Sequence, residues 1–151
     1  MYSRILVPVD GSVPSRCGLR EALGLAADGR ATVVLLHVAA EPALLMGAAG
    51  YVNYGELSDM LRRAGQEIVD DAAREAAKAG VPCETQVVDA GAGAVSDAIV
   101  DQASRQRCQL IVMGTHGRRG VRRLTLGSDA ELVVRHAPVP VLLVKAPEGT
   151  A

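Results

Sequence analysis

Residues 5–12 read ILVPVDGS, an apolar run that stops abruptly at a polar turn. The apolar part is continuous rather than alternating, which predicts a parallel strand buried on both faces of a sheet. Ser12 is suited to cap a helix, and Pro14 is suited to that helix's first turn. This stretch therefore predicts a buried strand that leads directly into a helix.

The alternation of buried strands with helices continues to the end of the chain. Strands are expected at 5–9, 32–38, 81–88, 110–113 and 139–144, with helical apolar spacing in the segments between them. Residues 39–55 have no clear periodicity, so a long loop is expected there. Strands that alternate with helices predict a single α/β domain over residues 1–151, in which helices cover both faces of a parallel sheet.

The composition narrows the classes of function. Hydrophobic residues make up 49% of the 151 residues, but the aromatic ones are three Tyr, with no Phe and no Trp. An aliphatic core is therefore expected, and a platform for stacking nucleic-acid bases is not, because such platforms need aromatic faces. The net charge of −1 gives no basic excess for binding nucleic-acid phosphates.

The chain reads as a soluble cytoplasmic protein with no membrane partner. No signal-peptide pattern precedes the first strand, and every apolar run is much shorter than a membrane span. The cysteines, Cys17, Cys83 and Cys108, are far apart and form no C-x-x-C pair. This spacing argues against a disulfide framework and against a zinc site.

Two polar segments follow expected strands and mark the candidate site. One is Pro8–Ser12 after the first strand, and the other is Gly114–Gly120 after the fourth. Ligands of open parallel sheets bind beyond the carboxyl ends of the strands, where the strand order reverses. Glycines allow the backbone to approach a ligand closely, and free N–H groups at a helix start near Ser128 attract phosphate. The alternative is that both segments are ordinary turns, with Ser128 only an N-cap.

The spacing of the glycines favours the ligand site. Gly114-x-x-Gly117, followed after nine residues by Gly127-Ser128, resembles the nucleotide motif of the universal stress protein family. The resemblance extends over nearly the whole chain, through ILVPVDGS, LLHV and IVMGTHGRRGVRRLTLGSDAELVVRHAPVPVLLV. Asp129 departs from the pattern, because the family often has Val there. A carboxylate at this position repels phosphate unless it faces away or helps to hold a cation.

The resemblance implies a strand order of 3-2-1-4-5 and a site for ATP or another adenine nucleotide, with Mg²⁺ or Mn²⁺ bound mainly through the phosphates. The adenosine part would lie at the strand ends, where Asp10 would make a polar contact and Pro8 and Val9 would line the pocket. The backbone of Val38 would contact the adenine edge. Met113 and Gly114 would pack near the sugar and base. The phosphates would be cradled by Gly117, Gly127, Ser128 and the N–H of Asp129.

Each of these assignments has a structural alternative. For Val38 and Met113 the alternative is plain core packing, which the sequence alone favours. For Asp10 the alternative is capping the first helix, which the sequence favours less than the ligand contact. The basic cluster at 118–123 could support the triphosphate or form a solvated loop face. His37, in the second strand, is expected to be a hydrogen-bonded core residue.

Other nucleotide motifs fit less well. Gly91-x-Gly93-x-x-Ser96 resembles a dinucleotide fingerprint, but its third position is Ser, and no acidic residue ends the strand at 110–113. The sequence has no G-x-x-x-x-G-K-[ST] and no evident catalytic triad. No catalytic residue and no metal-ligating set is therefore assigned, and any ATP hydrolysis is expected to be slow.

Three functions remain in competition. The first is an ATP-binding regulatory module of the universal stress type, the second a slow ATPase on the same site, and the third a nucleotide-free dimeric scaffold. The intact glycine motif favours the first. The resemblance also points to a homodimer formed by Val139 to Val144, where Pro140 suits an edge strand. Further protein partners are not named by the sequence.

Overall fold

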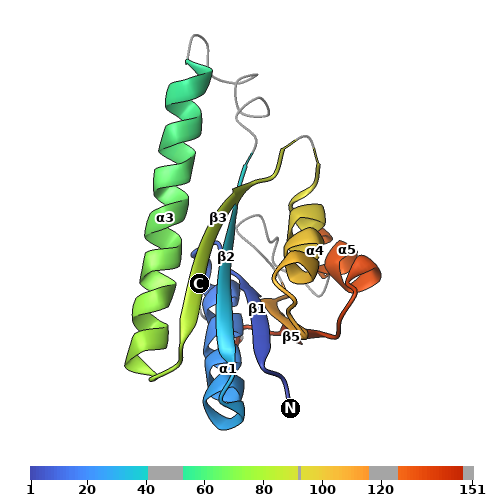
Figure 1. The fold of residues 1–151 in the computed structure, drawn as a ribbon. Helices are drawn as coiled ribbons and strands as arrows, with labels where there is room; N and C mark the ends of the chain where they lie inside the picture. Colours follow the sequence, from blue (N-terminus) through green and yellow to red (C-terminus); the bar gives the residue numbers. More distant parts are fainter. Residues whose placement is uncertain (41–52, 92, 116–125, 148–151) are drawn as a thin grey trace.

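The computed structural model describes residues 1–40, 53–91, 93–115 and 126–147, and Figure 1 shows their arrangement. The strands in these residues are β1 (Arg4–Pro8), β2 (Thr32–Ala39), β3 (Cys83–Asp89), β4 (Leu110–Gly114) and β5 (Val141–Val144). The helices are α1 (Val13–Gly29), α3 (Tyr54–Lys78), α4 (Val95–Arg105) and α5 (Ser128–His136).

The strands form one parallel sheet in the order β3-β2-β1-β4-β5, so the expected topology is confirmed. From β1 the chain builds outward through β2 to β3, and it then returns to place β4 on the other side of β1. Leu6 of β1 is paired with both Val34 of β2 and Ile111 of β4. The strand order therefore reverses beside β1, and the carboxyl ends of β1 and β4 meet at that point.

Two aliphatic layers hold helices on opposite faces of the sheet, as the alternation of strands and helices predicts. On one face, Ile5, Val7 and Leu35 pack with buried residues of α1 and α3. On the other, Leu6 and Leu36 pack with buried residues of α4 and α5. Figure 1 shows α3 on one side of the strands and the pair α4 and α5 on the other.

Polar caps set where the first two helices begin. The Ser12 hydroxyl accepts from the Ser15 N–H at 3.3 Å, so the expected cap of α1 is confirmed. The Asn53 side chain accepts from the Gly55 N–H at 2.9 Å and caps α3. The predicted loop at 39–55 is therefore wrong at its carboxyl end, where helix already begins, and residues 41–52 lie outside the described residues.

Prolines shorten the outer strands relative to the prediction. β3 begins at Cys83 rather than at 81, directly after Pro82. β5 begins at Val141 rather than at 139, directly after Pro140. Proline has no N–H to donate to a ladder, yet the Pro140 carbonyl still accepts from the Ile111 N–H at 3.0 Å.

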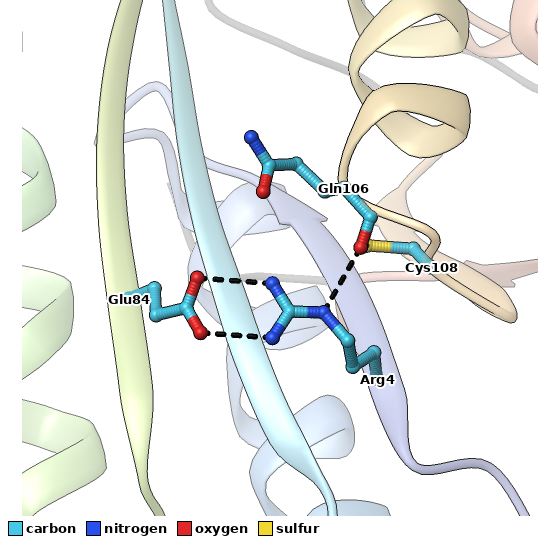
Figure 2. Close-up of polar contacts among 4 residues, drawn as sticks. All are labelled: Arg4, Glu84, Gln106 and Cys108. Carbon is cyan, nitrogen blue, oxygen red and sulfur yellow. Dashed lines mark hydrogen bonds and ion pairs between the residues drawn. The ribbon is translucent and has the colours of Figure 1, made fainter.

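At the amino ends of the strands, a polar cluster links β1 with β3 and with the segment after α4. Figure 2 shows Arg4 reaching over β2, where its guanidinium donates to both carboxylate oxygens of Glu84 at 2.8 and 2.9 Å. Its Nε donates to the Gln106 carbonyl at 2.9 Å. The hydrogen bond from Arg4 lowers the pKa of Glu84, while burial raises the pKa of the Cys108 thiol nearby. Because solvent screens the exposed carboxylate, the ion pair adds about 1 kcal/mol or less.

At the carboxyl ends of the strands, two glycines allow α1 to pack closely against the end of β4. A Cβ on Gly18 would lie 2.9 Å from the Gly114 nitrogen and 3.0 Å from the Met113 carbonyl carbon. A Cβ on Gly114 would lie 2.5 Å from the Pro14 carbonyl oxygen. These are backbone atoms that cannot rotate away, so the close approach requires glycine on both elements.

Two glycines of the same helix allow this constraint to be tested. Gly24, also in α1, has open space where a Cβ would be. Gly24→Ala should stabilise the protein by about 0.5–1 kcal/mol, because alanine loses less backbone entropy in a helix. Gly18→Ala should destabilise it by about 1–3 kcal/mol, because the methyl group overpacks against β4. Urea unfolding of both variants measures the difference, and equal stabilisation of the two would contradict the packing described.

Candidate functional site

The carboxyl end of β1 continues into a turn that holds the Asp10 carboxylate. The Val9 N–H still pairs with the Leu36 carbonyl, at 2.8 Å. An oxygen of the Asp10 carboxylate then accepts from the Ser12 N–H at 2.9 Å, and the Asp10 N–H donates to the Ser15 hydroxyl at 3.2 Å. The helix cap is Ser12, so the capping alternative for Asp10 is wrong. Asp10 instead braces the turn before the cap, with a half-buried side chain.

His37 supports this turn from the neighbouring strand. Its Nδ1 lies 2.8 Å from the Val9 carbonyl oxygen. A carbonyl can only accept, so Nδ1 carries the hydrogen and donates. The ring is covered by α3, where a Cβ on Gly65 would come within 2.5 Å of its Cδ2. The expected hydrogen bond of His37 is confirmed, although the residue is half-buried rather than fully in the core, and this bond fixes the carbonyl just before Asp10.

The side chains of Met113 and Val38 lie in the layer beneath α4 and α5. Met113 is 7% exposed and belongs to that core cluster, and the half-buried Val38 packs against it. Core packing, the alternative for both side chains, is confirmed. Gly114 faces the other way, toward Pro14 of α1, so the space above its missing Cβ is filled by the protein itself.

The end of β4 is joined to the start of α5. The Thr115 N–H donates to the Val144 carbonyl at 3.1 Å, and the Thr115 carbonyl accepts from the Gly127 N–H at 2.9 Å. Gly127 is the N-cap of α5, and Ser128 is its first helical residue. The predicted start of the helix at Ser128 is therefore confirmed, the alternative that Ser128 is only its N-cap is wrong, and the capping residue itself has no side chain.

The amino end of α5 consequently presents backbone donors. Its first intrahelical bond runs from the Glu131 N–H to the Gly127 carbonyl at 2.9 Å. The N–H groups of Ser128 and Asp129 precede that bond and have no partner within the helix. The helix dipole adds partial positive charge at the same place.

The helix start explains how a carboxylate is accommodated at Asp129, where the family often has Val. Its side chain is exposed in the first turn of α5, together with Glu131. Carboxylates in the first turn of a helix are favoured by its dipole by about 0.3–1 kcal/mol. Gly117 and the basic cluster at 118–123 lie outside the described residues, so their assignments stay predictions.

The described residues bring a carboxylate and backbone donors to one edge of the sheet. β1 and β4 are adjacent, so the Asp10 turn and the junction of Thr115 with Gly127 lie at the same carboxyl edge. This combination suits a ligand that has both polar groups and negative charge. In the ranges that the structure describes, no group of three or more His, Cys, Asp or Glu could hold a metal ion.

Two residues outside the glycine motif, neither of them predicted as a site residue, also shape the site. Ser15 is 6% exposed and holds the Asp10 N–H, and Gly18 admits α1 to the end of β4. The sequence pattern around each of these two residues could have indicated its role. Ser12-x-x-Ser15 is a repeated hydroxyl at a helix start, and Gly18 is an unexpected glycine in a helix interior.

None of the helices in the described part of the chain combines the length and the hydropathy needed to cross a bilayer.

Comparison with known proteins agrees with the fold. The sequence model described as Universal stress protein family matches residues 1–145. A universal stress protein of Methanocaldococcus jannaschii is 34% identical over 148 residues, which cover 98% of this chain and 85% of that protein.

Solved structures extend the agreement to three dimensions. The structure of MJ0577, from the same organism, has a TM-score of 0.83 at 26% identity and covers 99% of both chains. The universal stress protein from Archaeoglobus fulgidus in complex with dAMP has a TM-score of 0.70 at 26% identity, over 95% of this chain and 98% of that one. With the family match spanning nearly its whole length, this chain belongs to the universal stress protein family.

Proposed function

We propose that this protein binds an adenine nucleotide, with ATP and Mg²⁺ or Mn²⁺ as the expected ligands, at the carboxyl edge of β1 and β4. Binding, rather than turnover, is the proposed activity. The protein would act as a regulatory module of the stress response, whose nucleotide-bound state is read by partners.

The observation that carries the proposal is the start of α5. A glycine occupies the N-cap, so the capping residue has no side chain that could compete with a ligand for the first-turn N–H groups. The Gly127 N–H is bonded to the Thr115 carbonyl, which anchors the helix start beside β4. The donors for a phosphate are then the N–H groups of Ser128 and Asp129, reinforced by the helix dipole.

The adenosine part is proposed to lie over the end of β1. Asp10 is held there by its contacts with Ser12 and Ser15. Its carboxylate is suited to accept from a ribose hydroxyl, since ionised carboxylates are strong acceptors. The glycine motif and the dAMP bound to the Archaeoglobus fulgidus relative both support an adenine nucleotide as the ligand.

A divalent cation completes the proposed site. Several phosphate charges of a bound ATP would lie near the carboxylate of Asp129, which is exposed. Mg²⁺ or Mn²⁺, held mainly by phosphate oxygens and water, would neutralise them and offset the repulsion from that carboxylate.

The edge strand β5 supports the proposal of a homodimer. β5 is the last strand in the sheet order. Its residues are all apolar and none is fully buried, with Leu142 36% exposed. An apolar edge with unpaired backbone groups is a template for pairing with another chain. A second copy of this chain, adding its own β5, is the proposed occupant.

Substituting Gly127 tests the nucleotide site. Its φ of −60° and ψ of 145° are accessible to any L residue, so Gly127→Val should fold. The valine side chain would enter the space proposed for the phosphates. A steric clash and the loss of a charge-assisted hydrogen bond should together weaken ATP binding about a hundredfold, or roughly 3 kcal/mol. Calorimetric titration with ATP and Mg²⁺ measures the loss, and circular dichroism checks folding.

Ser128→Ala is the matched control for this variant. It removes one hydroxyl at the next position without filling any space, and Ser128 is not the helix cap. Its effect on ATP binding should stay within about tenfold. If folded Gly127→Val bound ATP as the parent does, the proposed phosphate site would be wrong.

The dimer proposal is tested by a charge on the edge strand. Leu142→Lys should shift the mass at tens of micromolar from dimer to monomer, because a lysine on the edge blocks strand pairing. Met60→Lys, at a residue that is 59% exposed on α3, should leave the mass at the dimer value. Light scattering distinguishes these outcomes, and a monomeric parent would contradict the proposal.

A further inference from the structure

Ser96 carries a buried hydroxyl that bonds to none of the described residues. The residue is 2% exposed in the first turn of α4, and its Oγ has no hydrogen-bond partner within the described part of the chain. The other buried polar residue of these ranges, Ser15, is hydrogen-bonded. An unpaired buried hydroxyl costs stability, so its presence in this position needs an explanation.

The helix geometry directs this hydroxyl toward the carboxyl edge of the sheet. Ser96, Ile99 and Ala103 form the buried face of α4, and the last two pack in the cluster beneath it. Ser96 lies one turn closer to the amino end than Ile99. Side chains of a helix tilt toward its amino end, and Figure 1 shows α4 starting where the chain turns back beyond the carboxyl end of β3.

The side chains near the amino end of α4 and the ends of β2 and β3 suit a neutral, flat ligand group better than an anion. Val38 and Val88, paired near the ends of β2 and β3, pack on the same cluster as Val95. The Asp97 carboxylate accepts from the Ala94 N–H at 3.2 Å and places negative charge at the helix start. Apolar walls with one neutral hydroxyl are typical of a pocket for a base or a nucleoside.

We infer that Ser96 is a ligand-facing residue of the nucleotide site, where its hydroxyl hydrogen-bonds to the adenosine part. This inference rests on the proposed function and extends it to a residue outside the glycine motif. The hydroxyl can donate or accept, so it suits both the nitrogens of adenine and the hydroxyls of ribose. It would thereby favour nucleosides over free phosphates at the β2 side of the site.

The test compares two serines of the same helix. Ser96→Ala should weaken binding of both ATP and adenosine about fivefold to tenfold, the loss expected for one neutral hydrogen bond. Binding of inorganic triphosphate should not change. Ser104→Ala should bind all three ligands as the parent does, because the Ser104 hydroxyl is exposed and donates to the Val100 carbonyl of its own helix. Thermal unfolding without ligand should show Ser96→Ala at least as stable as the parent, since no bond is lost.

The possible results distinguish a failure of the proposed nucleotide binding from a failure of the Ser96 assignment alone. A parent that binds neither ATP nor adenosine would overturn the proposed function and this inference with it. A parent that binds them, together with a Ser96→Ala variant that binds them equally well, would overturn the inference alone. So would a lower melting temperature of unliganded Ser96→Ala, or a weakening confined to triphosphate.

Discussion

The close approach of α1 to the end of β4 is the constraint on which the rest of the carboxyl edge depends. It requires glycine at both Gly18 and Gly114, because a Cβ on either would lie within 3 Å of backbone atoms. The contact seats Pro14, in the first turn of α1, against the last residue of β4. The turn that precedes α1 is thereby held over the place where the strand order reverses, which is where open parallel sheets bind ligands.

The polar contacts of the site follow from this placement. With α1 fixed, Ser12 and Ser15 are positioned to hold Asp10, and His37 of β2 fixes the Val9 carbonyl.

On the β4 side of the point where the strand order reverses, the Thr115 carbonyl anchors the amino end of α5 through Gly127. The backbone donors proposed to bind phosphate and the carboxylate proposed to face adenosine therefore come from elements far apart in sequence, and the sheet brings them to one edge.

Much of this could be predicted from the sequence, because strand burial and helix periodicity are local patterns. The element order and the Ser12 cap followed from such patterns, and the strand order followed from the family resemblance. The starts of β3 and β5 were wrong because a proline sits next to each, and the ladder is decided by pairing rather than by apolar runs. The helix start at Ser128 was predicted correctly, but the alternative that made Ser128 only a cap was wrong, because the N-cap is Gly127, whose N–H is bonded to the distant Thr115 carbonyl. Such contacts join distant segments, so no local pattern could have revealed them.

Amide chemical shifts during a titration with ATP and Mg²⁺ test the central claim, nucleotide binding at the carboxyl edge, most directly. The account predicts saturable changes at Asp10, Thr115 and Ser128 that share one affinity. The amides of Arg4 and Glu84, at the opposite edge of the sheet, should stay unchanged and serve as the internal reference. Changes centred on the amino edge, or no change at millimolar ATP, would contradict it.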